Sequence, residues 1–174
     1  VRTVPDAKHI REWLDRDTIN TGMNEYSGVN SIAKPKNAVV VGGGFIGLEM
    51  VENLIDRGLN VILIEKLDQV MPPLDPEMAL VVKRYMEKHR VRVELSDGVA
   101  GFRNSADGMI EVLTESGKVY PAEIVILAIG VKPETELAKM AGLELGKRGG
   151  FKVDDQMRTS NPDIFAVGDA VEVK

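Results

Sequence analysis

Apolar runs and helical periodicities alternate along the chain, and this alternation predicts an α/β fold. The runs at 38–41, 61–64 and 124–129 are apolar throughout, as expected of parallel strands that are covered on both faces. After each of the first two runs, apolar residues recur at helical spacing, over 45–57 and 76–90. We therefore expect a Rossmann-like, doubly wound parallel sheet in which 124–129 is a central strand.

The region before the last long apolar run predicts a third parallel strand and an insertion. Val91, Val93 and Leu95 alternate with charged residues, which is the period of a strand. Residues 98–120 then hold three short runs separated by two glycine-containing turns, which predicts an antiparallel β-meander. With right-handed crossovers, the parallel strands should follow the order 3-2-1-4. Four further segments are expected: a helix at 5–16, a linker at 20–37, a short helix at 134–141 and a strand at 163–169.

Each of the three main predicted helices has an apolar face, and this face should point toward the core. The residues expected to face inward are Ile10, Trp13 and Leu14 in the first helix, Ile46, Met50, Leu54 and Ile55 in the second, and Met78, Val81, Val82, Tyr85 and Met86 in the third.

Composition and charge exclude several classes of function. The net charge of −5 and the lack of a basic run argue against nucleic acid as a partner. No apolar run is long enough to span a membrane and the start lacks a signal-peptide pattern, so we expect a cytoplasmic protein. Without cysteine there is no disulfide, thiolate metal site or cysteine nucleophile. His9 and His89 have no partners at metal-ligand or catalytic-triad spacing, so we expect no catalytic residue and no metal. The first residue is Val1, which suggests a start inside a longer parent or after a removed tag.

The strongest motif is a glycine turn between the first strand and the helix that follows it. Gly42, Gly44 and Gly47 form a G-x-G-x-x-G pattern in a complete strand–turn–helix–strand context. In such a turn the first glycine permits the bend, the second lets the backbone approach a pyrophosphate, and the third permits close helix–strand packing. Glu65 ends the second strand, where an acid can accept hydrogen bonds from ribose hydroxyls and repel a 2′-phosphate. The pattern predicts a site that prefers NADH to NADPH; the alternative is a glycine-rich turn in an ordinary α/β domain.

Gly130 follows the strand at 124–129. Ligands bind at the carboxyl ends of strands in open α/β sheets, so this glycine is a candidate for the binding crevice. A simple turn glycine is an equal alternative at this position.

Three segments in register give the chain a family resemblance. They are Gly42-Gly43-Gly44-Phe45-Ile46-Gly47-Leu48-Glu49, Ala128-Ile129-Gly130-Val131-Lys132-Pro133 and Ile164-Phe165-Ala166-Val167-Gly168-Asp169. Together they resemble the flavin-dependent pyridine nucleotide-disulfide oxidoreductases, in particular the branch of coenzyme A disulfide reductases, NADH oxidases and NADH peroxidases.

The resemblance implies a domain organisation. In that family an NAD domain is inserted into an FAD domain. Residues 34–151 would then be the NAD(H)-binding domain, residues 1–33 a residual FAD-domain segment and linker, and residues 152–174 a second residual FAD-domain segment. The family's FAD fingerprint, redox cysteine and dimerisation domain are missing from this sequence. The partners would be a dinucleotide and the remaining FAD and dimerisation domains of the parent.

The resemblance also implies a reaction and a set of site residues. In the parent, NADH would pass a hydride to FAD, and a disulfide, oxygen, peroxide or polysulfide would be the final acceptor; FAD would be held by the full-length parent only. Phe45 would lie beside the nicotinamide, and Glu49 would follow one helical turn later on the same face. Gly130 would lie near the nicotinamide end of the dinucleotide. Asp169 would match the acid that binds the FAD ribityl chain. Helix-start packing for Phe45, a solvated charge for Glu49 and a turn role for Asp169 remain alternatives. The expected cofactor-binding set is Gly42, Gly44, Phe45, Ile46, Gly47, Glu49, Glu65, Lys66, Gly130 and Asp169.

Two other functions remain open at this point. One is a stand-alone NAD-sensing or regulatory Rossmann module, which would need an exposed partner surface. The other is a short-chain enzyme that uses NAD directly, which would need an acid or base beside the nicotinamide.

Overall fold

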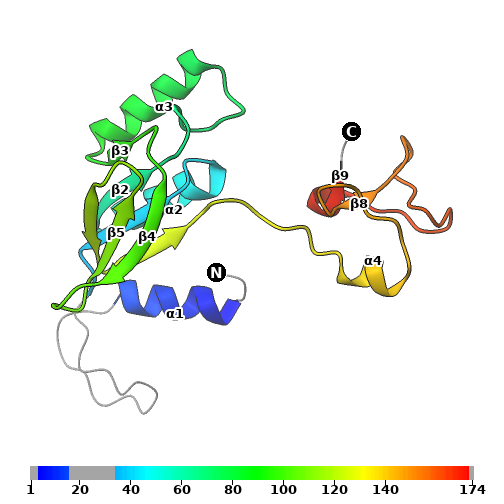
Figure 1. Ribbon diagram of the computed structural model, residues 1–174, viewed down its shortest axis with the longest axis horizontal. Helices are drawn as coiled ribbons and strands as arrows, with labels where there is room; N and C mark the ends of the chain where they lie inside the picture. Colours follow the sequence, from blue (N-terminus) through cyan, green and yellow to red (C-terminus); the bar gives the residue numbers. More distant parts are fainter. Residues whose placement is uncertain (1–3, 16–33, 173–174) are drawn as a thin grey trace, which may run out of the picture. The chain divides into compact units, whose positions relative to one another are not determined.

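The structure is a computed structural model of the 174-residue chain, and it describes residues 4–15 and 34–172 (Figure 1). The chain divides into two compact units, residues 1–129 and residues 130–174. Most of the linker expected at 20–37 lies outside the described residues.

A parallel sheet of four strands forms the centre of the first unit in the part of the chain that the structure describes. Its order is β3-β2-β1-β7, which confirms the predicted order 3-2-1-4 and the Rossmann-like class. The expectation that the run at 124–129 is a central strand was wrong, because β7 pairs with β1 and no other described strand pairs with its outer edge. The strands are β1 (Asn37–Val41), β2 (Asn60–Ile64), β3 (Arg92–Glu94) and β7 (Ile124–Leu127).

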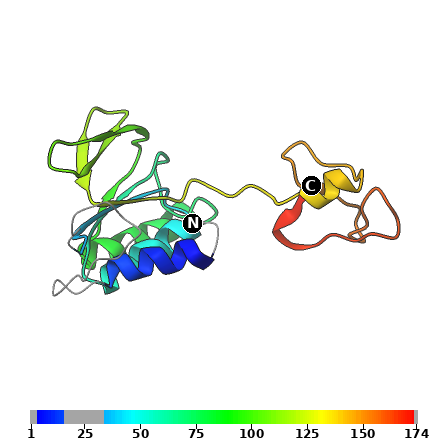
Figure 2. The same ribbon diagram turned by 90° about the horizontal axis from the view of Figure 1, so that it is seen from below.

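Three helices cover one face of this sheet, as Figure 2 shows: α1 (Val4–Leu14), α2 (Phe45–Asp56) and α3 (Pro76–Lys88). Their apolar side chains form one core with residues of alternate positions on the strands, such as Val40 and Leu63. Among the described residues, the predicted face of the first helix is confirmed, since Leu14 is buried and Ile10 and Trp13 pack against this core.

The predicted inward faces of α2 and α3 were partly wrong. Ile46 is half exposed in the first turn of α2. In α3 the buried stripe runs through Ala79 and Met86, whereas Met78, Val81 and Tyr85 are mostly exposed. The reason is that α3 packs on the edge strand β3, and an edge strand covers only a narrow stripe of a helix.

The meander covers the opposite face of the sheet. It consists of β4 (Val99–Asn104), β5 (Ile110–Thr114) and β6 (Val119–Ala122) in antiparallel order, as the turn pattern predicted. Val112, Tyr120 and Ala122 of the meander are buried with sheet residues such as Val39 and Ile64 in a second core. The sheet is therefore covered on both faces, which explains why 38–41, 61–64 and 124–127 are apolar at successive positions.

The second unit is small and has little regular structure. It contains α4 (Glu136–Met140), the parallel pair β8 (Phe151–Lys152) and β9 (Val171–Glu172), and the short 3₁₀ helix η1 (Gly168–Ala170). The strand expected at 163–169 was wrong: Phe165 makes an isolated bridge to Arg158, and the chain then turns into η1. Phe165 and Val167 are exposed, so no sheet within the described residues covers this apolar run.

Candidate functional site

The glycine turn joins the carboxyl end of β1 to the start of α2. The Gly42 N–H donates to the Ile64 carbonyl at 2.8 Å, which holds the turn against β2. Gly42 has a φ of +106°, and a Cβ atom there would collide with the Ala128 carbonyl just beyond β7. A Cβ atom at Gly47 would collide with the Gly42 carbonyl. Both glycines are therefore required by the fold itself, with the two roles that the motif assigns to its first and third positions.

Gly44 differs from these two glycines. It has a φ of −80°, which any residue adopts, and a Cβ atom there would meet no described atom within 4 Å. The packing of the chain therefore gives no reason for a glycine at this position. An open space in front of the backbone is what the close approach of a pyrophosphate needs.

The start of α2 is prepared for an anion. Among the described side chains, none makes a capping hydrogen bond at Gly44, and the first turn of α2 has no acidic residue. The N–H groups of the first turn and the positive end of the helix dipole are thus available to a ligand. This combination is the usual phosphate-binding geometry of a helix start.

Glu65 lies directly behind this turn, at the end of β2, and is only 8% exposed. Its Oε2 accepts the Gly43 N–H at 2.5 Å and its Oε1 accepts the Leu67 N–H at 2.8 Å. Each carboxylate oxygen keeps a further lone pair, which a ribose hydroxyl can use. The sequence predicted the acid but not these two bonds, which fix its carboxylate against the glycine turn.

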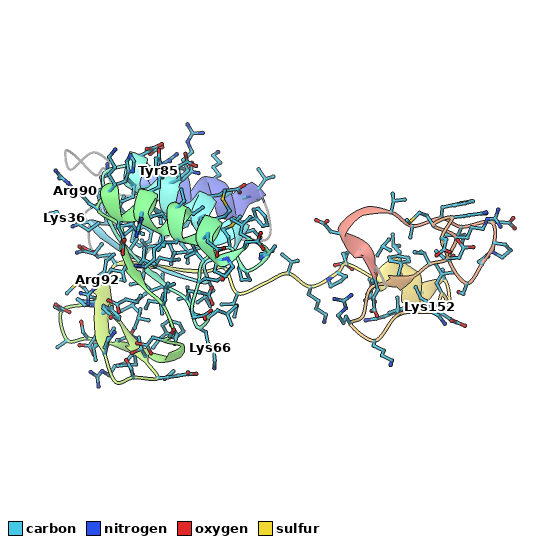
Figure 3. The ribbon with its side chains drawn as sticks, turned by 90° about the horizontal axis from the view of Figure 1, so that it is seen from above. Lys36, Lys66, Tyr85, Arg90, Arg92 and Lys152 are labelled. Atoms are coloured by element: carbon cyan, nitrogen blue, oxygen red, sulfur yellow. The ribbon has the colours of Figure 1, made fainter. Side chains whose placement is uncertain are left out.

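Lys66 is exposed and reaches toward the meander (Figure 3). Its Nζ donates to Oε1 of Glu115, in the turn between β5 and β6, at 2.9 Å. This hydrogen bond raises the pKa of Lys66 above its ordinary value of 10.5. Sequence reasoning placed Lys66 in the site but missed Glu115, because the two residues are 49 positions apart and belong to different layers.

A polar network fixes the meander beside the end of β2. Glu94 accepts hydrogen bonds from Lys118 at 2.7 Å and from Arg92 at 2.6 Å, and the bond from Lys118 is the main cause of its lowered pKa. The Arg92 guanidinium also lies 5.0 Å from the centre of the Tyr120 ring. Sheet and meander are therefore joined by charges as well as by the apolar core.

Phe45 and Glu49 lie together on the outer side of α2. Phe45 is 60% exposed, and both side chains line a groove of about 380 Å³ whose other wall contains Tyr85 and Met86 of α3. Phe45 is not part of the buried core among the described residues, and helix-start packing remains the alternative for this position. A position of these two residues beside the nicotinamide stays a prediction.

Gly130 and Asp169 belong to the second unit, and their place in the site stays a prediction. Gly130 has a φ of +121°, a conformation that favours glycine. Asp169 is an exposed residue of η1. In the described part of the chain, no group of three or more His, Asp and Glu side chains is placed to hold a metal ion, and no helix is both long and apolar enough to cross a membrane.

Comparison with known proteins identifies the family. The model of the pyridine nucleotide-disulphide oxidoreductase family matches residues 3–174. The NADH oxidase of Methanocaldococcus jannaschii is 40% identical over 174 residues, which are 99% of this chain and 35% of that protein. The chain thus spans about a third of the length of this relative.

Solved structures agree with this assignment. The reduced CoADR-RHD of Bacillus anthracis superposes with a TM-score of 0.80 at 46% identity, over 100% of this chain and 28% of that one. The water-forming NADH oxidase of Lactobacillus brevis bound to NADH has a TM-score of 0.71 at 35% identity, over 79% of this chain and 30% of that one. The chain therefore belongs to the pyridine nucleotide-disulphide oxidoreductase family.

Proposed function

We propose that this chain is the NADH-binding domain of a flavin-dependent oxidoreductase. The observation that carries the proposal is the arrangement at the end of β1. The open backbone at Gly44, the uncapped start of α2 and the buried carboxylate of Glu65 surround one position. A pyrophosphate fits the first two features, and an adenine ribose with two free hydroxyls fits the third.

The proposed choice of NADH over NADPH rests on Glu65. Because the Gly43 and Leu67 N–H groups hold both of its oxygens, the carboxylate cannot turn away from a ligand without losing two buried hydrogen bonds. A 2′-phosphate would meet this fixed negative charge. The relatives that are named NADH oxidases support the same choice.

In the proposed parent enzyme the domain presents the nicotinamide to FAD. The nicotinamide and the flavin supply the hydride chemistry, and this chain binds and orients the dinucleotide. Phe45 and Glu49, with Gly130, would lie at the nicotinamide end, and Asp169 would reach the flavin ribityl chain. Residues 34–151 would form the NADH domain, and the rest of the parent would supply the flavin site and the final acceptor: a disulfide, oxygen, a peroxide or a polysulfide.

Calorimetric titration of the purified chain with NADH and with NADPH tests this proposal. We expect saturable binding of NADH and binding of NADPH that is weaker by about tenfold or more, which corresponds to about 1.4 kcal/mol of repulsion or greater. The purified chain should be colourless and should consume no NADH with oxygen or a disulfide, because one glycine fingerprint cannot hold both cofactors.

Three results would contradict the proposal. The first is no binding of NADH, and the second is equal affinity for the two dinucleotides. The third is a yellow preparation that turns over NADH, which would show that the chain holds its own flavin site.

A further inference from the structure

The run Glu65-Lys66-Leu67 at the end of β2 carries two opposing charges. An acid at this place favours the free ribose hydroxyls of NADH, whereas a neighbouring cation is the group that accommodates the 2′-phosphate of NADPH. Which cofactor the run selects therefore depends on where the ammonium of Lys66 is held.

The ammonium is held by Glu115. The Nζ–Oε1 distance is 2.9 Å, and both side chains are more than half exposed. An exposed ion pair of this kind is weak if its partners are free to move. The question is therefore whether the protein fixes Glu115 in place.

The backbone around Glu115 is fixed by the segment that connects β3 to β4. The Glu115 N–H donates to the Gly98 carbonyl at 2.7 Å. Its carboxyl group also lies over Gly98, where a Cβ atom would come within 2.7 Å of the Glu115 Cδ. The absence of a side chain at Gly98 thus leaves the space that the Glu115 carboxylate occupies.

Asp97, the residue before Gly98, fixes the same turn. This carboxylate is 4% exposed, and it accepts the Ser116 N–H at 3.1 Å and the Ser116 hydroxyl at 2.6 Å. The Thr114 N–H donates to the Lys118 carbonyl and closes the turn. Glu115 therefore stands on a rigid turn with its carboxylate toward Lys66.

We propose that Glu115 is a positioning residue that sets cofactor specificity: it neutralises Lys66 and keeps its ammonium on the meander, so that only the charge of Glu65 acts on the ribose. This inference rests on the proposed function, since it concerns the same dinucleotide site. Without Glu115, Lys66 is free to pair with a 2′-phosphate.

The test compares NADH and NADPH affinities at low ionic strength for the unaltered chain, Glu115→Gln, Lys66→Gln and the double variant. Glutamine keeps the size of the side chain over Gly98 and removes its charge. We expect Glu115→Gln to raise the NADPH-to-NADH affinity ratio about fivefold, the upper range for an exposed ion pair, and expect this gain to shrink in 1 M salt. The double variant should lose the gain.

Glu111→Gln is the matched control. Glu111 lies on β5 and pairs with Arg103, so this variant removes a charge of the same sign from the same meander without touching Lys66. It should leave the affinity ratio unchanged. Thermal unfolding of each variant checks that the fold is intact.

Each outcome decides between the two proposals. An unmoved ratio in Glu115→Gln, or a gain that persists in the double variant, overturns the role of Glu115 while NADH binding stands. A similar gain in Glu111→Gln would assign the effect to net charge and also overturn it. No NADH binding by the unaltered chain would overturn the proposed function, and this inference with it.

Discussion

Replacement of Gly44 by valine should abolish most of the NADH affinity and leave the stability of the fold nearly unchanged. The backbone at Gly44 has φ −80° and ψ −173°, which a valine adopts without strain, and a Cβ atom there meets no described atom within 4 Å. Replacing a glycine by a residue with a side chain restricts the unfolded chain, which stabilises the folded protein by about 0.4–1 kcal/mol. Loss of the favoured glycine at the helix N-cap destabilises it by a similar amount. We therefore expect the free energy of unfolding to change by less than about 1 kcal/mol.

Binding should respond very differently. The valine side chain would occupy the space through which a pyrophosphate approaches the start of α2. Loss of two hydrogen bonds to a charged group, at about 1.5–3 kcal/mol each, weakens binding by about 3 kcal/mol or more. NADH affinity should thus fall by more than about a hundredfold. Calorimetry with NADH measures this loss, and thermal unfolding followed by circular dichroism measures the stability.

Gly42→Ala provides the contrast within the same turn. At a φ of +106° an alanine is strained by about 1–3 kcal/mol, and its Cβ atom would also push against the Ala128 carbonyl. This variant should lose stability, unlike Gly44→Val. A folded Gly44→Val protein that retains its NADH affinity would contradict this prediction, because the dinucleotide would then bind elsewhere.

Three further predictions address the parts around the site. Glu65→Ser should lower the free energy of unfolding by about 1–3 kcal/mol, because two backbone N–H groups lose their acceptor. Calorimetry should also show a smaller ratio of NADH affinity to NADPH affinity than in the unaltered chain. The Ser116 hydroxyl holds the pKa of Asp97 below its ordinary value of 3.8, so the Asp97 carboxylate stabilises the fold above pH 3.8 and this stabilisation is lost as the pH falls below that value. Unfolding measured as a function of acid pH should show the loss, and the Asp97→Asn variant should lack this pH dependence. Trp13→Ala should destabilise the first unit by about 3 kcal/mol in urea unfolding, since Trp13 packs α1 against the core, and an unchanged midpoint would show that α1 is not part of that core.

Local patterns were sufficient to predict the sheet and the glycine turn. The order of the strands follows from apolar runs, crossovers and handedness, and the meander follows from turn residues at regular spacing. Gly42 and Gly47 are required by contacts within a few residues or with the adjacent strand, so a motif captures them.

Other features depend on neighbours that a local pattern does not contain. Tyr85 is exposed because α3 packs on the edge strand β3. The predicted strand at 163–169 does not form, because this run has no sheet to pair with among the described residues. The bond from Gly43 to Glu65 joins two motif positions, but the ion pair of Lys66 with Glu115 joins separate layers. Neither periodicity nor spacing could reveal that pair.

The position of the dinucleotide is tested most directly by nuclear magnetic resonance of the isotopically labelled chain during titration with NADH. We expect saturable chemical-shift changes that concentrate on the backbone amides of Gly42 to Gly47 and of Glu65 to Leu67. Residues of the groove wall on α3, such as Met86, should move less. Shifts that centre on that groove, or no saturable shifts at the glycine turn, would contradict the claim that this turn binds NADH.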